Sequence, residues 1–222
     1  MLVAFLQENI NAFAWDAADM CEINPEIMVH RLNVDPSMRP VKQKKTIFGN
    51  ERSQAIKEEV EKLLRINYIR PVQYPEWLAN MVLVPKTNNN WRMCIHFSDL
   101  NKACPKDSYP LPRINALIDS TSGCELMSFL DAFQGYNQIR LADQDQEKIS
   151  FVTDQGIFCY NVMPFGLKNA GVTYHRLVNN MFRKQIGKNM EVYIDDMLAR
   201  VKKRKTMRRI CKLALAYYDN LG

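Results

Sequence analysis

MEVYIDDMLA, residues 190–199, places two adjacent carboxylates, Asp195 and Asp196, in the middle of an apolar run. Aspartate is depleted in β-strands, and two unpaired carboxylates inside a strand would be costly to bury. The stretch therefore predicts two strands joined by a tight turn, with both aspartates at its tip. Carboxylate oxygens at a rigid turn suit a hard cation such as Mg²⁺. One pair does not complete a metal site, so a third carboxylate is needed from elsewhere in the chain.

The composition limits the classes of protein to which the chain can belong. The chain has 222 residues, of which 47% are hydrophobic, enough for a sizeable core. It has no run of about eighteen apolar residues, so no transmembrane helix is expected, and residues 1–13 lack the basic start of a signal peptide. The six cysteines form no C-x-x-C pair and are poorly spaced for zinc binding. These features predict an intracellular protein, in a cytoplasmic particle or the nucleus rather than secreted.

The excess positive charge lies at the end of the chain. The formal net charge is +6, and the stretch from Arg200 to Lys212 holds eight basic residues and no acidic one. Apolar residues recur at helical spacing from Ile210 to Leu221, so residues 200–222 predict a basic, helical tail. Its first cations are candidates for binding nucleic acid, although a solvated helix face is the commoner use of such charges. These candidates are Arg200, Lys202, Lys203, Arg204 and Lys205.

The rest of the chain predicts an α+β domain preceded by an arm. Residues 1–45 are interrupted by proline and predict an extension with a short helix over 2–14. Residues 46–199 alternate predicted hairpins and helices, which favours α+β over a doubly wound sheet. The expected helices cover 53–64, 114–118 and 169–183, with Ser53 as the cap of the first and a helical turn within 132–139. The expected hairpins pair 78–84 with 91–97 and 149–153 with 157–162, and a turn is expected at 163–166.

The predicted buried strand 126–131 ends in the third carboxylate, Asp131. A single aspartate at a strand end is usually a turn or cap residue. If this strand lies beside the hairpin carrying Asp195, the carboxylates could share two Mg²⁺ ions roughly 3.5–4 Å apart. Such a site also needs cations near a triphosphate, and Lys86 and Arg92 are available in the 78–97 hairpin. Taken alone, these two cations fit a solvated hairpin face better.

Three motifs carry a family resemblance. FLDAFQGYNQI at 129–139, MPFGLKNA at 163–170 and YIDD at 193–196 resemble the reverse transcriptase of gypsy-type long-terminal-repeat retrotransposons. YPEWLAN at 74–80 and LNKACPKD at 100–107 resemble the plant members. The resemblance covers residues 13–199. It implies a polyprotein domain with the fingers and palm of a right-hand polymerase and an antiparallel palm sheet backed by helices. The sequence ends at Gly222, so the thumb is expected to be missing or truncated.

The resemblance also implies roles for individual residues. Asp131, Asp195 and Asp196 match the catalytic triad that holds two Mg²⁺ ions, with Mn²⁺ as a substitute. Lys86 and Arg92 match residues that contact the incoming triphosphate. Tyr136 matches the aromatic residue under the incoming sugar, where it excludes ribonucleotides; the alternative is a buried core tyrosine. Phe165 and Gly166 match the turn against the nucleotide and template; the alternative is a plain Pro-Phe-Gly turn.

Two departures from the family pattern lie in the predicted fingers. His96 stands where relatives usually have Asp, and histidine is at most partly charged at neutral pH. Asn88–Asn90 stands where relatives commonly have Gly and Lys, which removes a cation near the triphosphate. We expect these changes to order the fingers less well without abolishing the chemistry.

The leading hypothesis is an RNA-directed DNA polymerase. A primer 3′-hydroxyl, paired to an RNA or DNA template, would attack the α-phosphate of a deoxynucleoside triphosphate, and pyrophosphate would leave. The alternative is a catalytically incompetent retrotransposon remnant that binds nucleic acid weakly through the basic tail. An unrelated metal-dependent phosphohydrolase is a third reading, which the order of the motifs disfavours. The sequence leaves the oligomeric state open.

Overall fold

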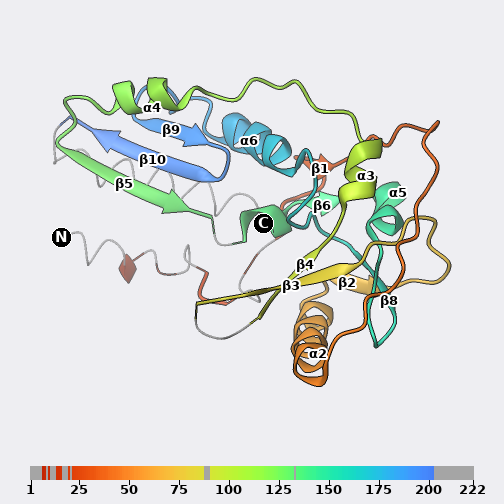
Figure 1. Cartoon of the computed structure of the whole chain (residues 1–222). Helices are drawn as coiled ribbons and strands as arrows, with labels where there is room; N and C mark the ends of the chain where they lie inside the picture. Colours follow the sequence, from red (N-terminus) through yellow and green to blue (C-terminus); the bar gives the residue numbers. More distant parts are fainter. Residues whose placement is uncertain are drawn as a thin grey trace. The chain divides into compact units, whose positions relative to one another are not determined.

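The computed structural model of the chain describes residues 7–8, 10, 14–16, 20, 22–87, 91–132 and 134–202. The expected helix over 2–14 falls mostly outside this part, and the expected helix in the tail falls wholly outside it. The chain forms two compact units. Unit 1 contains Met1–Met28, Ser108–Gln138 and Gly171–Gly222, and unit 2 contains Val29–Asp107 and Ile139–Ala170. Figure 1 labels the elements of both units.

Unit 1 is built on a three-stranded antiparallel sheet. Its order is β5 (Leu126–Asp131), β10 (Asp196–Val201) and β9 (Met190–Tyr193). The strands β9 and β10 confirm the predicted hairpin, and β5 has the predicted bounds. Period-2 alternation gives the sheet a buried face, which includes Val192, Met197 and Ala199, and an exposed one. The prediction that 126–131 is a buried strand was wrong, because Phe129 on the exposed face is 78% exposed.

Helices accompany this sheet. Among the described residues, they include α4 (Ile114–Ser120) and α6 (Ala170–Met181), and Figure 1 shows both near the strands of this sheet. The predicted apolar stripe of α6 is buried at Tyr174, Leu177 and Val178, which anchors this helix in the core. By contrast, α4 has no buried residue. The predicted helical turn within 132–139 is the 3₁₀ helix η3 (Gly135–Gln138).

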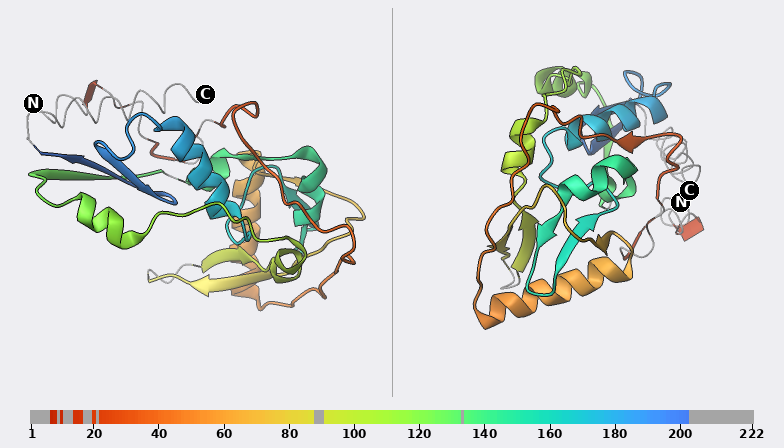
Figure 2. Two further views of the ribbon diagram at one scale, coloured as in Figure 1. Left: turned by 90° about the horizontal axis from the view of Figure 1, so that it is seen from above. Right: turned by 90° about the vertical axis from the view of Figure 1, so that its right-hand side faces the viewer.

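Unit 2 holds both predicted hairpins, the one between residues 78 and 97 and the one between residues 149 and 162. A parallel pair is formed by β1 (Val29–His30) and β6 (Arg140–Leu141). A second sheet has the order β2 (Ile69–Pro71), β8 (Ile157–Tyr160) and β7 (Phe151–Val152). The third is the hairpin of β3 (Met81–Pro85) and β4 (Trp91–Ile95). The helices of unit 2 are α2 (Asn50–Arg65), α3 (Ser98–Ala103), α5 (Asp143–Gln146) and the 3₁₀ helix η4 (Glu147–Ile149). Figure 2 shows these helices and sheets from two further sides. Helices and mostly antiparallel strands confirm the α+β class.

The helix α2 begins earlier than its apolar spacing predicts. It starts at Asn50 with Gly49 as its N-cap, so Ser53 lies inside the first turns and is not the cap. The Ser53 hydroxyl instead donates to the Asp154 carboxylate, with 3.1 Å between Oγ and Oδ2. Leu64, near the end of the helix, is 38% exposed. The 3.6-residue period turns this position toward the edge of the apolar face.

A buried polar cluster lies where β1 meets α5 in unit 2. Asp145 is 3% exposed, and its carboxylate accepts from the Leu32 amide at 3.0 Å and from the Lys148 Nζ at 2.7 Å. His30 is 1% exposed. Burial lowers the pKa of His30 from 6.5 to about 4, and the negative charge of Asp145 opposes this shift. His30 is therefore neutral in the folded protein near pH 7.

This burial predicts a loss of stability in mild acid. Between pH 6.5 and about 4, His30 takes up a proton in the unfolded chain but stays neutral in the folded one. The unfolded state then binds more protons, so the free energy of unfolding falls as the pH is lowered through this window. The lowered pKa of His30 corresponds to about 3 kcal/mol of the free energy of unfolding, and this amount is fully present above pH 6.5. Urea unfolding across this range should show a steeper loss for wild type than for His30→Gln. Equal slopes would contradict the prediction.

None of the helices in the described residues is long and apolar enough to cross a membrane.

Candidate active site

The three predicted aspartates lie at one end of the unit 1 sheet. Asp131 is the last residue of β5 and Asp196 is the first of β10, and the antiparallel register places them directly opposite one another. Asp195 lies in the turn between β9 and β10. The prediction that both adjacent aspartates sit at the tip was therefore wrong for Asp196, which belongs to the strand. Ile194 occupies the turn instead, with φ of 57°, a conformation that is costly for a β-branched residue.

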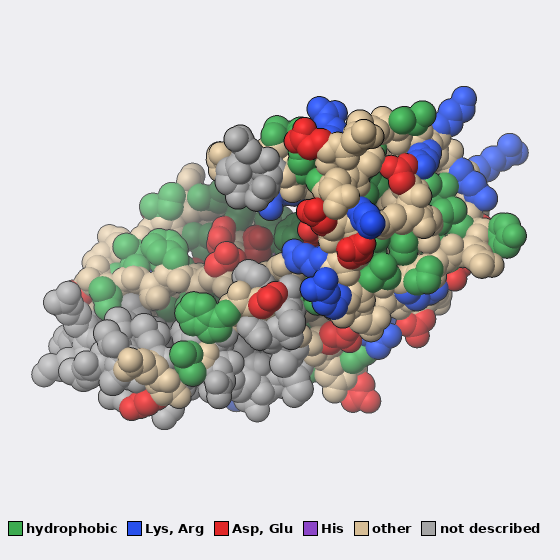
Figure 3. Space-filling view, turned by 90° about the horizontal axis from the view of Figure 1, so that it is seen from below, with side chains coloured by type: hydrophobic (Ala, Val, Ile, Leu, Met, Phe, Trp, Pro, Cys, Tyr) green, Lys and Arg blue, Asp and Glu red, His purple; other side chains and the backbone are tan. Residues whose placement is uncertain are grey.

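The register puts Asp131 and Asp196 on the same face of the sheet. Directly opposed residues in an antiparallel pair have Cβ atoms roughly 4.5–5.5 Å apart and side chains on one face. Both residues are exposed. The same face of β5 carries Met127 and Phe129, which are 45% and 78% exposed. The space-filling view shows acidic side chains gathered beside hydrophobic ones (Figure 3). This face therefore joins negative charge to an accessible apolar surface.

The donor set fits a divalent cation in chemistry and in backbone placement. All three residues offer carboxylate oxygens, the ligands that Mg²⁺ and Mn²⁺ prefer. Within the described part of the chain, no three His, Cys, Asp or Glu side chains are grouped closely enough to hold an ion. The opposed pair, Asp131 and Asp196, and the neighbouring Asp195 therefore supply suitable ligand atoms without forming a closed cation site in the described residues.

Tyr136 lies close to these carboxylates. It is half-buried in η3, and its ring centroid is 5.5 Å from that of Tyr174 in α6. Burial and the negative charges of Asp195 and Asp196 raise the pKa of Tyr136 to about 12. Its phenol therefore keeps its proton at neutral pH. The ring is thus partly buried against α6 and partly exposed.

Two glycines that the sequence analysis passed over allow this close packing. A Cβ added at Gly135 would lie 2.8 Å from the Tyr174 ring. A Cβ added at Gly171 would lie 3.2 Å from both the Tyr136 hydroxyl and Ile194 Cγ2. The helix α6 thus approaches Tyr136 and the Asp195 turn at a point where it has no side chain. Glycine inside a helical pattern is the signal that could have pointed to this contact.

Gly171→Ala tests how tightly this contact is set. Alanine is up to about 1 kcal/mol more favourable than glycine in a helix interior, so helix propensity would keep or raise the free energy of unfolding. The new Cβ instead requires Tyr136 or Ile194 to move by a few tenths of an ångström. We expect the variant to keep its melting temperature but to lose about tenfold in nucleotide incorporation, because small displacements at a site are costly. Unchanged incorporation would show that Tyr136 and the turn tolerate the shift.

The predicted nucleotide-contacting residues Lys86, Arg92, Phe165 and Gly166 belong to unit 2. In β4 the predicted alternation is confirmed: Ile95 and the following Phe97 are buried, whereas Arg92 is exposed. Lys86 is exposed and follows the last residue of β3. His96, the first departure, is also exposed, and Asn88–Asn90, the second, lies outside the described residues.

The predicted turn at 163–166 is present in unit 2. Phe165 is 59% exposed, and Gly166 has φ of 95°, which favours glycine. A Cβ at Gly166 would lie 3.5 Å from the Ile95 carbonyl oxygen, so the turn packs against the end of β4. The structure therefore brings Phe165 and Gly166 to β4, which carries Arg92, and it gathers the aspartates with Tyr136 in unit 1.

Arg200 corrects the predicted basic tail. The strand β10 continues to Val201, which pairs with Leu126 and is 4% exposed, so Arg200 is a strand residue. Its guanidinium Nη2 donates to Glu191 Oε1 at 2.7 Å, and both side chains are largely buried. This ion pair, rather than a solvent-facing tail, uses the charge of Arg200. Lys202 is exposed, and Lys203, Arg204 and Lys205 lie outside the described residues.

Comparison with known proteins gives one consistent family. Residues 84–222 match the family described as "Reverse transcriptase (RNA-dependent DNA polymerase)". The chain is 35% identical over 151 residues to the Retrovirus-related Pol polyprotein from transposon gypsy of Drosophila melanogaster, covering 66% of this chain and 15% of the polyprotein. It is 39% identical over 107 residues to an RNA-directed DNA polymerase homolog of Oenothera berteroana, covering 48% of this chain and 75% of the homolog.

Solved structures agree on the fold. The protease-reverse transcriptase of prototype foamy virus superposes with a TM-score of 0.86 at 18% identity, over 100% of this chain and 29% of the viral one. At this identity the likeness shows the fold alone. It confirms the predicted right-hand polymerase fold of fingers and palm. The chain spans about 15% of the length of the transposon polyproteins that it matches.

Proposed function

We propose, on the premise that this chain belongs to the reverse transcriptase family, that it adds deoxynucleoside monophosphates to a primer 3′-hydroxyl on an RNA template. The observation that carries this proposal is the register of the sheet in unit 1. Asp131 lies directly opposite Asp196, and Asp195 lies in the adjoining turn. Three carboxylates at one strand end form a suitable donor set for the divalent ions that phosphoryl transfer requires.

The residues of unit 1 would bind the metal ions and the sugar of the nucleotide. Asp131, Asp195 and Asp196 would hold two Mg²⁺ ions, with Mn²⁺ as a substitute. Bound there, the ions would lower the pKa of the primer hydroxyl and neutralise charge on the leaving pyrophosphate. Tyr136 would support the sugar of the incoming nucleotide as a neutral phenol.

The exposed cations of the β3–β4 hairpin would bind the triphosphate. Arg92 would grip two phosphate oxygens at once, and Lys86 would act as a point charge. The turn at Phe165 and Gly166 would lie against the nucleotide and the template. Each of these roles, including that of Tyr136, is a proposal that rests on the family match.

The wider context is also proposed. Foamy virus reverse transcriptase has been solved with an RNA/DNA hybrid and with double-stranded DNA, which supports a primed nucleic acid as the partner here. The match to the gypsy polyprotein supports an origin in a gypsy-type retrotransposon polyprotein. The Oenothera homolog supports a plant member of that group. We also propose an intracellular location, on the basis of the scattered cysteines.

A second candidate function is nucleic-acid binding without catalysis. The observation in its favour is that the three carboxylates are not gathered into a closed group in the described residues. In this case the chain would bind a primed template weakly and incorporate nothing.

Primer extension separates the two candidates. The full chain is incubated with poly(rA)/oligo(dT), dTTP and Mg²⁺, with foamy virus reverse transcriptase as the positive control. We expect dTMP incorporation that stops when EDTA removes the metal. If the positive control works and this chain incorporates nothing, the polymerase proposal is overturned. Fluorescence anisotropy with a labelled primer–template then measures whether the binding candidate holds.

A further inference from the structure

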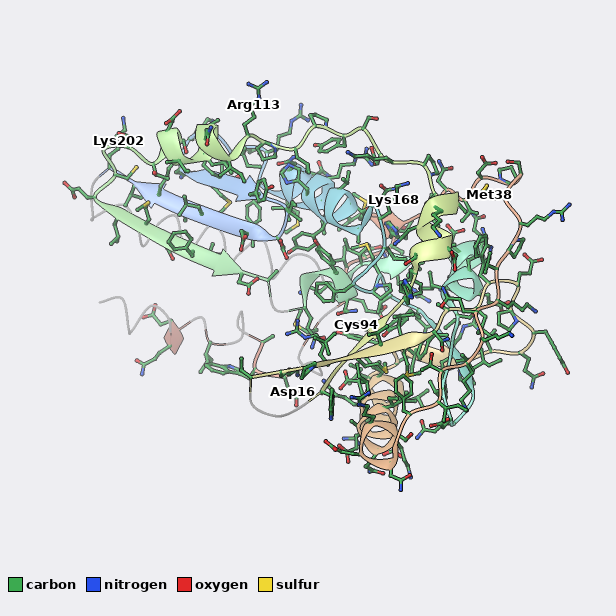
Figure 4. All side chains as sticks on the ribbon, viewed as in Figure 1. Asp16, Met38, Cys94, Arg113, Lys168 and Lys202 are labelled. Carbon is green, nitrogen blue, oxygen red and sulfur yellow. The ribbon has the colours of Figure 1, made fainter. Side chains whose placement is uncertain are left out.

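A set of hydrogen bonds in unit 2 ties the end of α3 to the turn that carries Phe165. The Nζ of Lys168 donates to the backbone oxygens of Asn101 and Cys104, at 3.2 and 2.7 Å. The Lys168 amide donates to Asn101 Oδ1 at 2.9 Å. Figure 4 shows Lys168 beside α3. A cation on the last carbonyls of a helix satisfies orphan acceptors and complements the helix dipole.

Asn101 and Asn169 complete the connection. The Nδ2 of Asn101 donates to the Gly166 carbonyl at 2.8 Å. Asn169 donates from Nδ2 to the Pro105 carbonyl at 2.8 Å and accepts from the Asp107 amide through Oδ1 at 3.1 Å. Asn101, Lys168 and Asn169 together are called the α3 clamp below. Each asparagine uses both ends of its side-chain amide, so the two segments are fixed in one register.

The clamp determines where the turn lies. On one side, Gly166 packs against β4, within van der Waals reach of the Ile95 carbonyl and the Phe97 ring. On the other side, its own carbonyl accepts from Asn101. Between these supports Phe165 remains 59% exposed. An exposed side chain on a doubly supported turn is suited to present a fixed surface to a ligand.

We propose that Asn101, Lys168 and Asn169 are positioning residues that hold the Phe165–Gly166 turn in the conformation that receives the incoming base pair. This inference rests on the proposed polymerase function. The clamp residues belong to unit 2, whereas the aspartates that would carry the chemistry belong to unit 1. Loosening the turn therefore weakens nucleotide binding and leaves the chemical step largely intact.

The test is a comparison of steady-state kinetics for Lys168→Met and Lys102→Met. Lys102 is the matched control, because it lies in α3, the helix that Lys168 contacts, its side chain is 72% exposed, and it pairs with Asp99 at 3.0 Å. We expect Lys168→Met to raise KM for dTTP about tenfold and to change kcat by less than about threefold, whereas Lys102→Met leaves both within about twofold. Lys168→Arg, which can still donate to two carbonyls, should bring KM for dTTP back close to the wild-type value.

A role in folding alone would give a different result. Loss of folded enzyme lowers the apparent kcat and leaves KM unchanged, because the remaining folded molecules bind nucleotide normally. A fall in kcat at constant KM for Lys168→Met would therefore overturn the positioning role. So would a KM that rises equally in the Lys102→Met control.

Hydrogen exchange tests the clamp without any need for activity. The amides of Lys168 and Asp107 donate to Asn101 Oδ1 and Asn169 Oδ1, so Asn101→Ala and Asn169→Ala should each speed exchange at their own partner. Unchanged exchange in both variants would overturn the clamp. If the wild type incorporates no nucleotide, the proposed function fails separately, and affinity for dTTP in a complex with primer–template replaces KM in the comparison. Equal affinities of Lys168→Met and Lys102→Met would then overturn the positioning role.

Discussion

Asp131→Asn is expected to lower nucleotide incorporation by about a thousandfold. The amide keeps the shape of the carboxylate but removes its charge, and with it the affinity for a hard divalent cation. Metal electrostatics is worth several kcal/mol at the transition state of phosphoryl transfer. A loss of about 4 kcal/mol corresponds to a thousandfold in rate, since each 1.36 kcal/mol is tenfold. Steady-state primer extension over a range of Mg²⁺ concentrations measures the loss.

The stability of the same variant should not fall. Asp131 is exposed at the end of β5, where a substitution usually changes the free energy of unfolding by less than about 0.5 kcal/mol. It also lies directly opposite Asp196, and like charges in that arrangement repel. Removing one of them should keep or slightly raise the midpoint of urea unfolding. Activity and stability are thus expected to move in opposite directions, which a general folding defect cannot produce.

Asp119→Asn is the matched control for this prediction. Asp119 lies in α4 of the same unit and is also exposed, so the substitution removes the same charge away from the strand ends. We expect it to keep its activity within about twofold. Full activity in Asp131→Asn would remove Asp131 from the proposed metal site. Equal losses in both variants would point to the net charge of the unit instead of a specific donor.

The sequence predicted the elements around Asp131 better than their register. Apolar runs were enough to find β5 and the β9–β10 hairpin, and alternation was enough to find the face of β4 that carries Arg92. The turn was misplaced by one residue, because strand propensity assigns aspartate to turns and isoleucine to strands. The fold reverses this preference at Ile194, which adopts a left-handed conformation, and so places Asp196 opposite Asp131. Local propensity carries no information about that pairing.

Burial and distant contacts were harder to predict. An apolar run such as 126–131 fits a buried strand and a half-exposed one equally well, and only the exposure of Phe129 decides between them. The partners of Gly171 and Lys168 lie tens of residues away in the sequence, so no local pattern reveals them. Arg200 belonged to a basic run by sequence, but pairing with Glu191 across the β9–β10 hairpin gives it a structural role.

Tyr136→Ala is expected to reduce discrimination against ribonucleotides by about 10–200-fold. In the proposed complex the Tyr136 ring fills the space beside the 2′ position of the incoming sugar, so a 2′-hydroxyl is rejected by steric contact. Packing against Tyr174 and the close approach of Gly171 restrict its movement away from this place. A steric pocket that differs by one small group typically discriminates within this range. The measurement is the ratio of kcat/KM for dATP to that for ATP on a poly(rU) template with an oligo(dA) primer.

Tyr136→Phe distinguishes the effect of the ring from that of the hydroxyl. The pKa of about 12 means that the phenol carries no charge at the pH of the assay, so its loss removes no ionised group from the site. The phenylalanine ring should therefore keep the ratio of the wild type within about threefold. Alanine also removes packing against Tyr174 and should destabilise the fold by about 2 kcal/mol, given a half-buried ring. The ratio of two substrates is independent of the folded fraction, so an unchanged ratio in Tyr136→Ala would limit Tyr136 to a packing role.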